Sequence, residues 1–217
     1  AYHKHPVHYR MRTLEIFAGT QSFSKAVIRH SEENEVVTVD LLKKFQPTFK
    51  CDIECWDYKA FAPGHFDVVW CSPPCTDYSI AKTRGVRNLE LADRLVMKAW
   101  QIIDYFKPRV YIVENVGTGL LVQRMRHIRP GVKVQFVDYC AYGKPYRKRT
   151  AIWSNVEFDF KLCSGPGNCS SMIGRRHCGS CGNARALYNS TGTTSLWQKN
   201  SIPEKLVDTI VNVCAAM

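Results

Sequence analysis

Alternation of short apolar runs with helical patterns is the feature that most restricts the fold of this 217-residue chain. Between residues 88 and 106, for example, apolar residues recur at helical spacing. The runs that we interpret as strands are residues 13–17, 35–39, a brief run ending near 51–53, 66–70, 109–113, 132–138 and 150–153. Strands and helices joined by short links predict an α/β fold, in which helices cover both faces of a mostly parallel, Rossmann-like sheet. We expect the first five strands in the order 3-2-1-4-5, with the chemistry at their carboxyl ends.

A change in composition separates the end of the chain from the rest. Residues 156–199 are dominated by glycine, serine, asparagine and cysteine and show little periodicity, which predicts a small separate module. A helical pattern returns after Ser201, with Pro203 in its first turn. We therefore expect a main domain over 1–155, a cysteine-rich module over 156–199 and a C-terminal helix within 200–217.

The charge of the chain points to a polyanionic partner. Thirty lysines and arginines against 19 acidic residues give a net charge of +11, which favours nucleic acid. No apolar run is long enough to predict a membrane span, and no apolar signal segment is visible. We therefore expect an intracellular, reducing compartment, in which the ten cysteines are thiols, a nucleophile or metal ligands rather than disulfides.

The ends of the first three predicted strands suggest a nucleoside cofactor. The first strand ends in the small-residue turn Phe17-Ala18-Gly19-Thr20, which lets a ligand approach backbone amides. The second ends at Asp40 and the third near Asp52, where carboxylates can hold ribose hydroxyls and an adenine amino group. Aspartate is also common at strand ends, so the argument depends on all three ends meeting at one edge of the sheet.

The fourth and fifth strands end in a thiol and a carboxyl. Two prolines separate Cys71 from Cys75 and would hold the two thiols apart, so we interpret Cys71 as a small apolar residue of the strand end. Cys75 lies beyond the prolines, in a polar loop. Glu114 follows the fifth strand, where a lone glutamate could merely cap a helix, but the expected strand order puts it beside Cys75. A thiol next to a partly desolvated carboxyl is more often functional than structural.

The motifs at these positions resemble those of the DNA cytosine-5 methyltransferases, in a compact form of the viral, phage or microbial type. The matching segments, in order, are FAGTQS, the Asp40 and Asp52 strand ends, SPPCTDYS, VENV, GKPYRKRT and KNSIPEKL. The resemblance implies a class I methyltransferase fold with catalytic residues in 1–155, S-adenosylmethionine as cofactor and a C-terminal helix that packs back beside the first strand. It also implies double-stranded DNA as partner and a target cytosine flipped out of the helix. The alternatives are an RNA (transfer RNA) cytosine-5 methyltransferase, an inactive nucleic-acid-binding relative, and a zinc-dependent binding module on a Rossmann-like scaffold.

The same resemblance implies a role for each catalytic residue. Cys75 would add to C6 of cytosine, while Glu114 would bond to N3 and the exocyclic amine. Arg147 and Arg149 would contact the base O2 and a nearby phosphate, unless this is only a basic surface strand. Tyr146 replaces the glutamine that usually precedes the arginines, which leaves the register of this motif ambiguous by one residue.

The expected cofactor site spans five motifs. Its residues are Phe17, Ala18, Gly19, Thr20, Asp40, Leu41, Asp52, Ile53, Ser72, Pro74, Asn200 and Ser201. Gln21 and Ser22 depart from the glycine pair that is usual in the family, which bears on cofactor affinity.

The cysteine-rich module has the spacing of a metal site. It contains Cys163, Cys169, Cys178 and Cys181, with His177 as the alternative to its neighbour Cys178. A segment so poor in apolar residues needs a crosslink, and structural zinc provides one in a reducing compartment. The alternative is a loose loop with free thiols. We expect the flanking arginines to contact nucleic acid together with Arg147 and Arg149; they are Arg175, Arg176 and Arg185.

Overall fold

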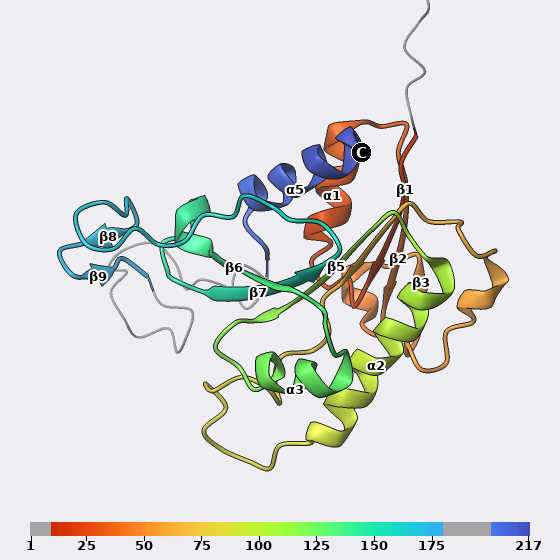
Figure 1. The fold of residues 1–217 in the computed structure, drawn as a ribbon, viewed down its shortest axis with the longest axis horizontal. Helices are drawn as coiled ribbons and strands as arrows, with labels where there is room; N and C mark the ends of the chain where they lie inside the picture. The colour runs from red at the N-terminus through yellow and green to blue at the C-terminus, as the bar shows by residue number, and fades with distance from the viewer. Residues whose placement is uncertain (1–9, 180–200) are drawn as a thin grey trace, which may run out of the picture.

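A seven-stranded sheet with the order β3-β2-β1-β4-β5-β7-β6 forms the centre of the computed structural model, which describes residues 10–179 and 201–217 (Figure 1). The strands are β1 Arg12–Ile16, β2 Glu35–Asp40, β3 Phe49–Lys50, β4 Val68–Cys71, β5 Val110–Val116, β6 Val134–Asp138 and β7 Arg149–Ser154. The α-helices are α1 Ser22–His30, α2 Leu89–Phe106, α3 Leu121–Ile128 and α5 Glu204–Ala216. Short 3-10 turns are η1 Lys43–Phe45, η2 Tyr58–Ala60 and η3 Tyr139–Tyr142.

The topology confirms the predicted α/β class and the order of the first five strands. Strands β1 to β5 are parallel, and β7 is antiparallel to both of its neighbours. The third strand is shorter than expected and ends before 51–53, because the Asp52 carboxylate accepts a hydrogen bond from the amide of Glu54 and turns the chain. The parallel arrangement brings the carboxyl ends of β1, β2, β4 and β5 to one edge of the sheet.

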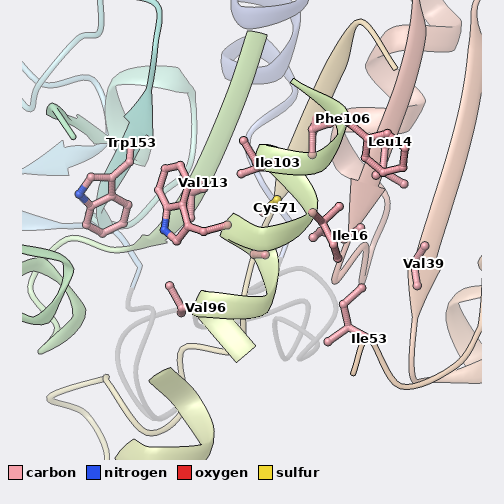
Figure 2. Packing of buried hydrophobic residues seen from close by; sticks show 14 of the residues in the cluster. Leu14, Ile16, Val39, Ile53, Cys71, Val96, Ile103, Phe106, Val113 and Trp153 are labelled. Atoms are coloured by element: carbon pink, nitrogen blue, oxygen red, sulfur yellow. The ribbon is translucent and has the colours of Figure 1, made fainter. Parts of the chain in front are cut away.

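Alternating side chains of the central strands pack against different helices. Leu14, Cys71 and Val113 face the side covered by α2, where Val96 and Ile103 complete one hydrophobic cluster (Figure 2). Cys71 is fully buried there, in agreement with its interpretation as an apolar strand residue. It therefore contributes packing, not chemistry.

The opposite face is covered by α1 and α5, which lie side by side although they come from the two ends of the described chain (Figure 1). Trp70 of β4 stacks on Phe23 of α1 with ring centroids 4.6 Å apart, and Ile210 of α5 belongs to the same cluster. Burial of both faces explains why the strands are almost continuously apolar. Among the described residues, every helix is too short or too polar to cross a lipid bilayer.

The cysteine-rich segment forms a small hairpin beyond the β6–β7 end of the sheet (Figure 1). Its two strands are β8 Met172–Ile173 and β9 Arg176–His177, which pair in antiparallel register. Gly174 at the turn has a φ of +59°, a left-handed conformation that glycine adopts without strain.

Candidate active site

Several hydrogen bonds fix the loop that carries Cys75 at the carboxyl end of β4. The side-chain amide of Asn115 donates to the carbonyl of Pro73 at 2.9 Å and is itself buried. Beyond the cysteine, the amides of Tyr78 and Ser79 donate to the Cys75 carbonyl at 3.1 and 2.8 Å. Because Pro73 and the following proline also restrict the backbone, Cys75 is held in a turn of defined direction.

Tyr78 fastens the far end of this loop to the α2–α3 side of the protein. Its ring is fully buried, and its hydroxyl donates to Asp93 at 2.8 Å. Asp93 also pairs with Arg124 of α3. The carbonyl of Tyr78 lies so close to Gly119 that a Cβ there would be 2.9 Å from it, so this contact requires glycine. The loop is thus supported on both sides of the thiol.

Glu114 lies on β5, the strand next to β4, and is only 8% exposed. The hydroxyl of Tyr139 donates to its Oε1 atom at 3.2 Å. The Nζ atom of Lys148 lies 3.8 Å from the same oxygen and 4.8 Å from the centre of the Tyr139 ring. A buried carboxyl is therefore paired with one hydroxyl donor and one cation.

The Cys75 loop and Glu114 lie at the carboxyl ends of two paired strands, β4 and β5, and the bond from Asn115 to Pro73 joins them. Cys75 as a whole residue is exposed, but desolvation of its sulfur raises the pKa of the thiol, Lys148 lowers it, and Glu114 raises it again. Lys148 favours the thiolate, which is the nucleophilic form.

The structure places both predicted arginines beside Asp138. Arg149 donates to both carboxylate oxygens of Asp138, at 2.7 and 2.8 Å, and the Nε atom of Arg147 lies 3.3 Å from Asp138. Lys148, the residue between them, lies beside Glu114. Successive side chains of an extended segment point in opposite directions, which explains why Lys148 and its two neighbours contact different carboxylates.

Asp138 is fully buried and holds the arginines in place. Burial alone would raise its pKa, but hydrogen bonds from Arg149, the amide of Cys163 and Arg147 keep the pKa below the ordinary value. The carboxylate thus connects the end of β6, the start of β7 and the cysteine-rich segment.

The predicted cofactor residues of β1 and β2 form one compact turn. Phe17 and Gly19 adopt left-handed φ angles of 55° and 47°. The amide of Gly19 donates to Asp40 at 2.8 Å, and the amide of Leu42 donates to the other carboxylate oxygen at 2.8 Å. Each oxygen has a second lone pair, so the Asp40 carboxylate can still accept from a ribose hydroxyl. The Leu41 side chain is 60% exposed at the same strand end.

The remaining predicted cofactor residues surround this turn. Ile53 is buried beside β2, and Asp52 caps the short turn that follows β3. The Ser72 hydroxyl accepts from the indole of Trp70 at 2.8 Å, and Pro74 is exposed. Asn200 lies outside the described residues.

A cavity of about 230 Å³ lies between the N-terminal ends of α1 and α5. Thr20 and Ser201 line it, although the sequence separates them widely, and the ammonium group of Lys144 donates to Ser201 at 2.9 Å. Burial and the charge of Lys148 lower the pKa of Lys144. Lys25 also lines this cavity, as do Arg29 and Glu204, which pair with each other, so the two lysines leave the cavity with a positive balance that suits a small anionic group such as a carboxylate.

The predicted metal ligands are only partly brought together. Cys163 and Cys169 lie in one group with His177, the alternative to Cys178, and with Cys140, which sequence analysis missed. Cys178 is not in this group, because its neighbour His177 on β9 takes the inward position. Cys181 lies outside the described residues.

The arginines expected to contact nucleic acid are partly described. Arg175 and Arg176 are exposed at the turn of the β8–β9 hairpin, next to Ile173, which is 77% exposed. Arg185 lies outside the described residues.

The fold and the site define an enzyme of the α/β methyltransferase class. The methyltransferase EhMeth of Entamoeba histolytica shares the fold, with a TM-score of 0.50 over 71% of this chain and 56% of that chain at 14% identity. Within this class, the chain belongs to the C-5 cytosine-specific DNA methylase family, whose model matches residues 11–142. It is therefore a DNA cytosine-5 methyltransferase by family.

Two named relatives support the assignment. The chain is 36% identical over 177 residues to a probable DNA (cytosine-5)-methyltransferase of Frog virus 3 (isolate Goorha), covering 75% of this chain and 79% of the viral protein. It is 27% identical over 165 residues to the type II methyltransferase M.AgeI of Thalassovita gelatinovora, covering 64% of this chain and 38% of that protein. The match to the viral protein thus spans most of both chains.

Proposed function

We propose that this chain methylates C5 of a flipped-out cytosine in double-stranded DNA, with Cys75 as nucleophile and Glu114 as the acid at N3. The observation that carries the proposal is that β5 places Glu114 beside Lys148 and, through the next residue Asn115, holds the loop that carries Cys75, in a chain of the cytosine-5 methylase family. S-adenosylmethionine, the cofactor that the family implies, supplies the methyl group when it is bound.

In the proposed reaction, the Cys75 thiolate forms a bond to C6 while the Glu114 carboxyl gives a proton to N3. This addition leaves the nucleophilic electron pair at C5, which would accept the methyl group as the bond between the methyl carbon and the cofactor's sulfur breaks, its electron pair going to the sulfur. Afterwards the C5 proton leaves to a base, the C6–sulfur bond breaks, and Glu114 takes back the N3 proton. The thiolate is thereby regenerated, and the aromatic ring is restored.

Lys148 takes the cationic position that the family resemblance implied for an arginine. It favours the Cys75 thiolate, and it lies beside the oxygen of Glu114. We propose that its ammonium group also contacts the base O2, where negative charge grows as sulfur adds to C6. Arg149 then orders the motif through Asp138, while the half-exposed Arg147 can reach a phosphate.

The proposed cofactor site combines the turn 17–20 with the cavity that Thr20 and Ser201 line. Two left-handed residues shape this turn, its Gly19 amide fixes Asp40, and Asp40 retains acceptor capacity for the ribose. Ser201 and Lys144 fit the carboxylate of an amino-acid moiety, because they place a hydroxyl and a cation in one small cavity. Asp52, Ile53, Ser72 and Pro74 are proposed to line the adenine side.

The proposed DNA contacts involve the exposed β8–β9 hairpin. Arg175 and Arg176 extend from its turn, and the whole chain carries a net charge of +11. A DNA-recognition element as small as this hairpin favours a short recognition sequence. Arg185 is proposed as a further contact from sequence alone.

A product assay tests this function. The full chain is incubated with methyl-labelled cofactor and a cytosine-containing DNA duplex, and the nucleosides are separated after digestion. We expect labelled 5-methyldeoxycytidine, and no label in a control duplex whose cytosines are already 5-methylated. Label in another nucleoside, or transfer to an RNA of the same sequence in place of DNA, would contradict the proposal.

A further inference from the structure

Three sulfurs and one imidazole nitrogen converge beside the catalytic sheet, on residues from two separate parts of the chain. All four ligand atoms, from Cys140, Cys163, Cys169 and His177, lie within 4.8 Å of one another. We propose that these four residues bind one structural Zn²⁺ ion, and that this ion fastens the cysteine-rich segment to the end of β6 beside the active site.

The distances within the group fit tetrahedral zinc. The Nε2 atom of His177 lies 3.4 Å from the sulfur of Cys163 and 3.8 Å from that of Cys169. A tetrahedral ion with bonds of about 2.3 Å to sulfur and about 2.05 Å to nitrogen separates such ligand atoms by about 3.6 Å. The two observed values lie on either side of it. Hard cations such as Mg²⁺ and Ca²⁺ are excluded as the natural occupants, because they take oxygen ligands.

The backbone builds the group from three local structures. Cys140 lies in η3, directly after β6. The turn that leads to Cys169 contains Gly165 at a φ of +81°, and the Cys169 amide closes it on the Gly165 carbonyl at 2.9 Å. His177 lies on β9 opposite Met172 of β8. Three of the four ligands are therefore presented by a 3-10 turn, a glycine turn and a hairpin.

The environment matches the charge of the proposed complex. Three thiolates and one Zn²⁺ ion carry a net charge of −1. The side chains of Arg149 and Arg147 and the amide of the proposed ligand Cys163 all contact the same Asp138 carboxylate, so both guanidinium groups lie beside the group. The same arginines hold Asp138, so the charge of the metal complex is balanced within the arginine motif.

One of the proposed metal ligands is the sequence neighbour of a residue that contacts the proposed catalytic acid. Tyr139, whose hydroxyl donates to Glu114, directly precedes Cys140. The Cys140 carbonyl accepts from the hydroxyl of Ser171 at 3.3 Å, and the amide of Cys163 donates to Asp138 at 2.9 Å. An ion at this place therefore joins the hairpin that we expect to contact DNA to the turn that positions Glu114.

Metal analysis of the full chain tests the ligand set without measuring methylation. Protein purified under reducing conditions without chelator is expected to contain about one zinc per chain. Cys140→Ser should lose most of this zinc, whereas Cys178→Ser, the matched control on an adjacent cysteine outside the group, should retain it. Wild type without zinc, or zinc lost from Cys178→Ser and kept in Cys140→Ser, would overturn the proposal.

Cobalt substitution separates loss of a ligand from loss of folding. Co²⁺ in wild type should give the visible absorption of a tetrahedral site and a sulfur-to-metal charge-transfer band. His177→Cys should still bind Co²⁺, with a stronger charge-transfer band from its fourth thiolate. Unchanged absorption in His177→Cys would show that residue 177 is not a ligand. These measurements need neither cofactor nor DNA. A negative result would therefore refute the metal site without refuting the proposed methyl transfer, and the reverse also holds.

Discussion

Replacing Lys148 with methionine tests whether this lysine is the cation of the active site. The change keeps most of the aliphatic stem but removes the charge that lies 3.8 Å from Glu114. Lys148 also lowers the pKa of Cys75 against the effect of burial, so its loss raises that pKa further. At neutral pH less of the cysteine is then present as thiolate.

The size of the effect follows from the proposed contact of the Lys148 ammonium group with the base O2, where negative charge grows as sulfur adds to C6. The Lys148 side chain is 19% exposed, so solvent screens part of this interaction. A net loss of about 2 kcal/mol, typical of a hydrogen bond to a charged group, corresponds to about a 30-fold lower rate.

Single-turnover methylation measured from pH 6 to pH 10 is the assay. Because the rate rises as the thiol loses its proton, the rising limb of Lys148→Met should lie at higher pH than that of wild type. The difference in methylation rate between Lys148→Met and the wild type should therefore become smaller as the pH increases. Lys148→Arg should recover most of the rate.

Arg147→Met is the matched comparison. It removes the same charge at the preceding residue, whose side chain contacts a different carboxylate, Asp138. It should weaken DNA binding and leave the pH profile in place. If Lys148→Met keeps the wild-type rate and profile while Arg147→Met shifts them, the assignment of the cation to Lys148 is refuted.

Three further substitutions test the parts that support the site. Glu15 is buried and hydrogen-bonded to Ser24, and burial raises its pKa from 4.5 to about 7; since the unfolded chain ionises first, stability should fall as the pH rises between these values. Between pH 4 and pH 8, Glu15 should lower the free energy of unfolding of the wild type by about 3 kcal/mol. Glu15→Gln should lack this contribution, and a variant with the same pH dependence as the wild type would contradict the assignment. Asn115→Ala removes the bond to Pro73 and should lower the methylation rate about 10-fold or more with only about 1–2 kcal/mol lost on denaturation, so a wild-type rate would show that the loop does not need it. Gly119→Ala puts a Cβ 2.7 Å from Val116 and should cost about 1–3 kcal/mol on urea denaturation, and a neutral result would mean that the turn relaxes freely.

The strand order was predictable from local patterns, and with it the placement of the Cys75 loop and Glu114 at the ends of neighbouring strands. Apolar runs define the strands, and parallel topology brings their carboxyl ends together without any knowledge of side-chain contacts. Gly19 and Asp40 meet at one edge of the sheet for the same reason. These features depend on the order of the elements alone.

Lys148 and Cys140 were not predictable in this way. The choice between Lys148 and its two arginine neighbours depends on the register in which β7 begins, and the basic residues 147–149 give no apolar pattern to fix it. Cys140 belongs to the main domain in sequence, and only tertiary folding brings it to Cys163 and His177. Its one visible signal was a cysteine directly after a predicted strand.

Trapping with 5-fluorocytosine tests the central claim most directly. Fluorine takes the place of the C5 hydrogen and cannot leave as a cation, so the elimination that releases the thiolate is blocked and a duplex containing this base should stay covalently attached to the enzyme after methyl transfer. We expect a denaturation-resistant protein–DNA adduct whose digest maps to the peptide containing Cys75, and no adduct with Cys75→Ala. An adduct on another cysteine, or methylation of ordinary DNA by Cys75→Ala, would contradict nucleophilic catalysis by this thiol.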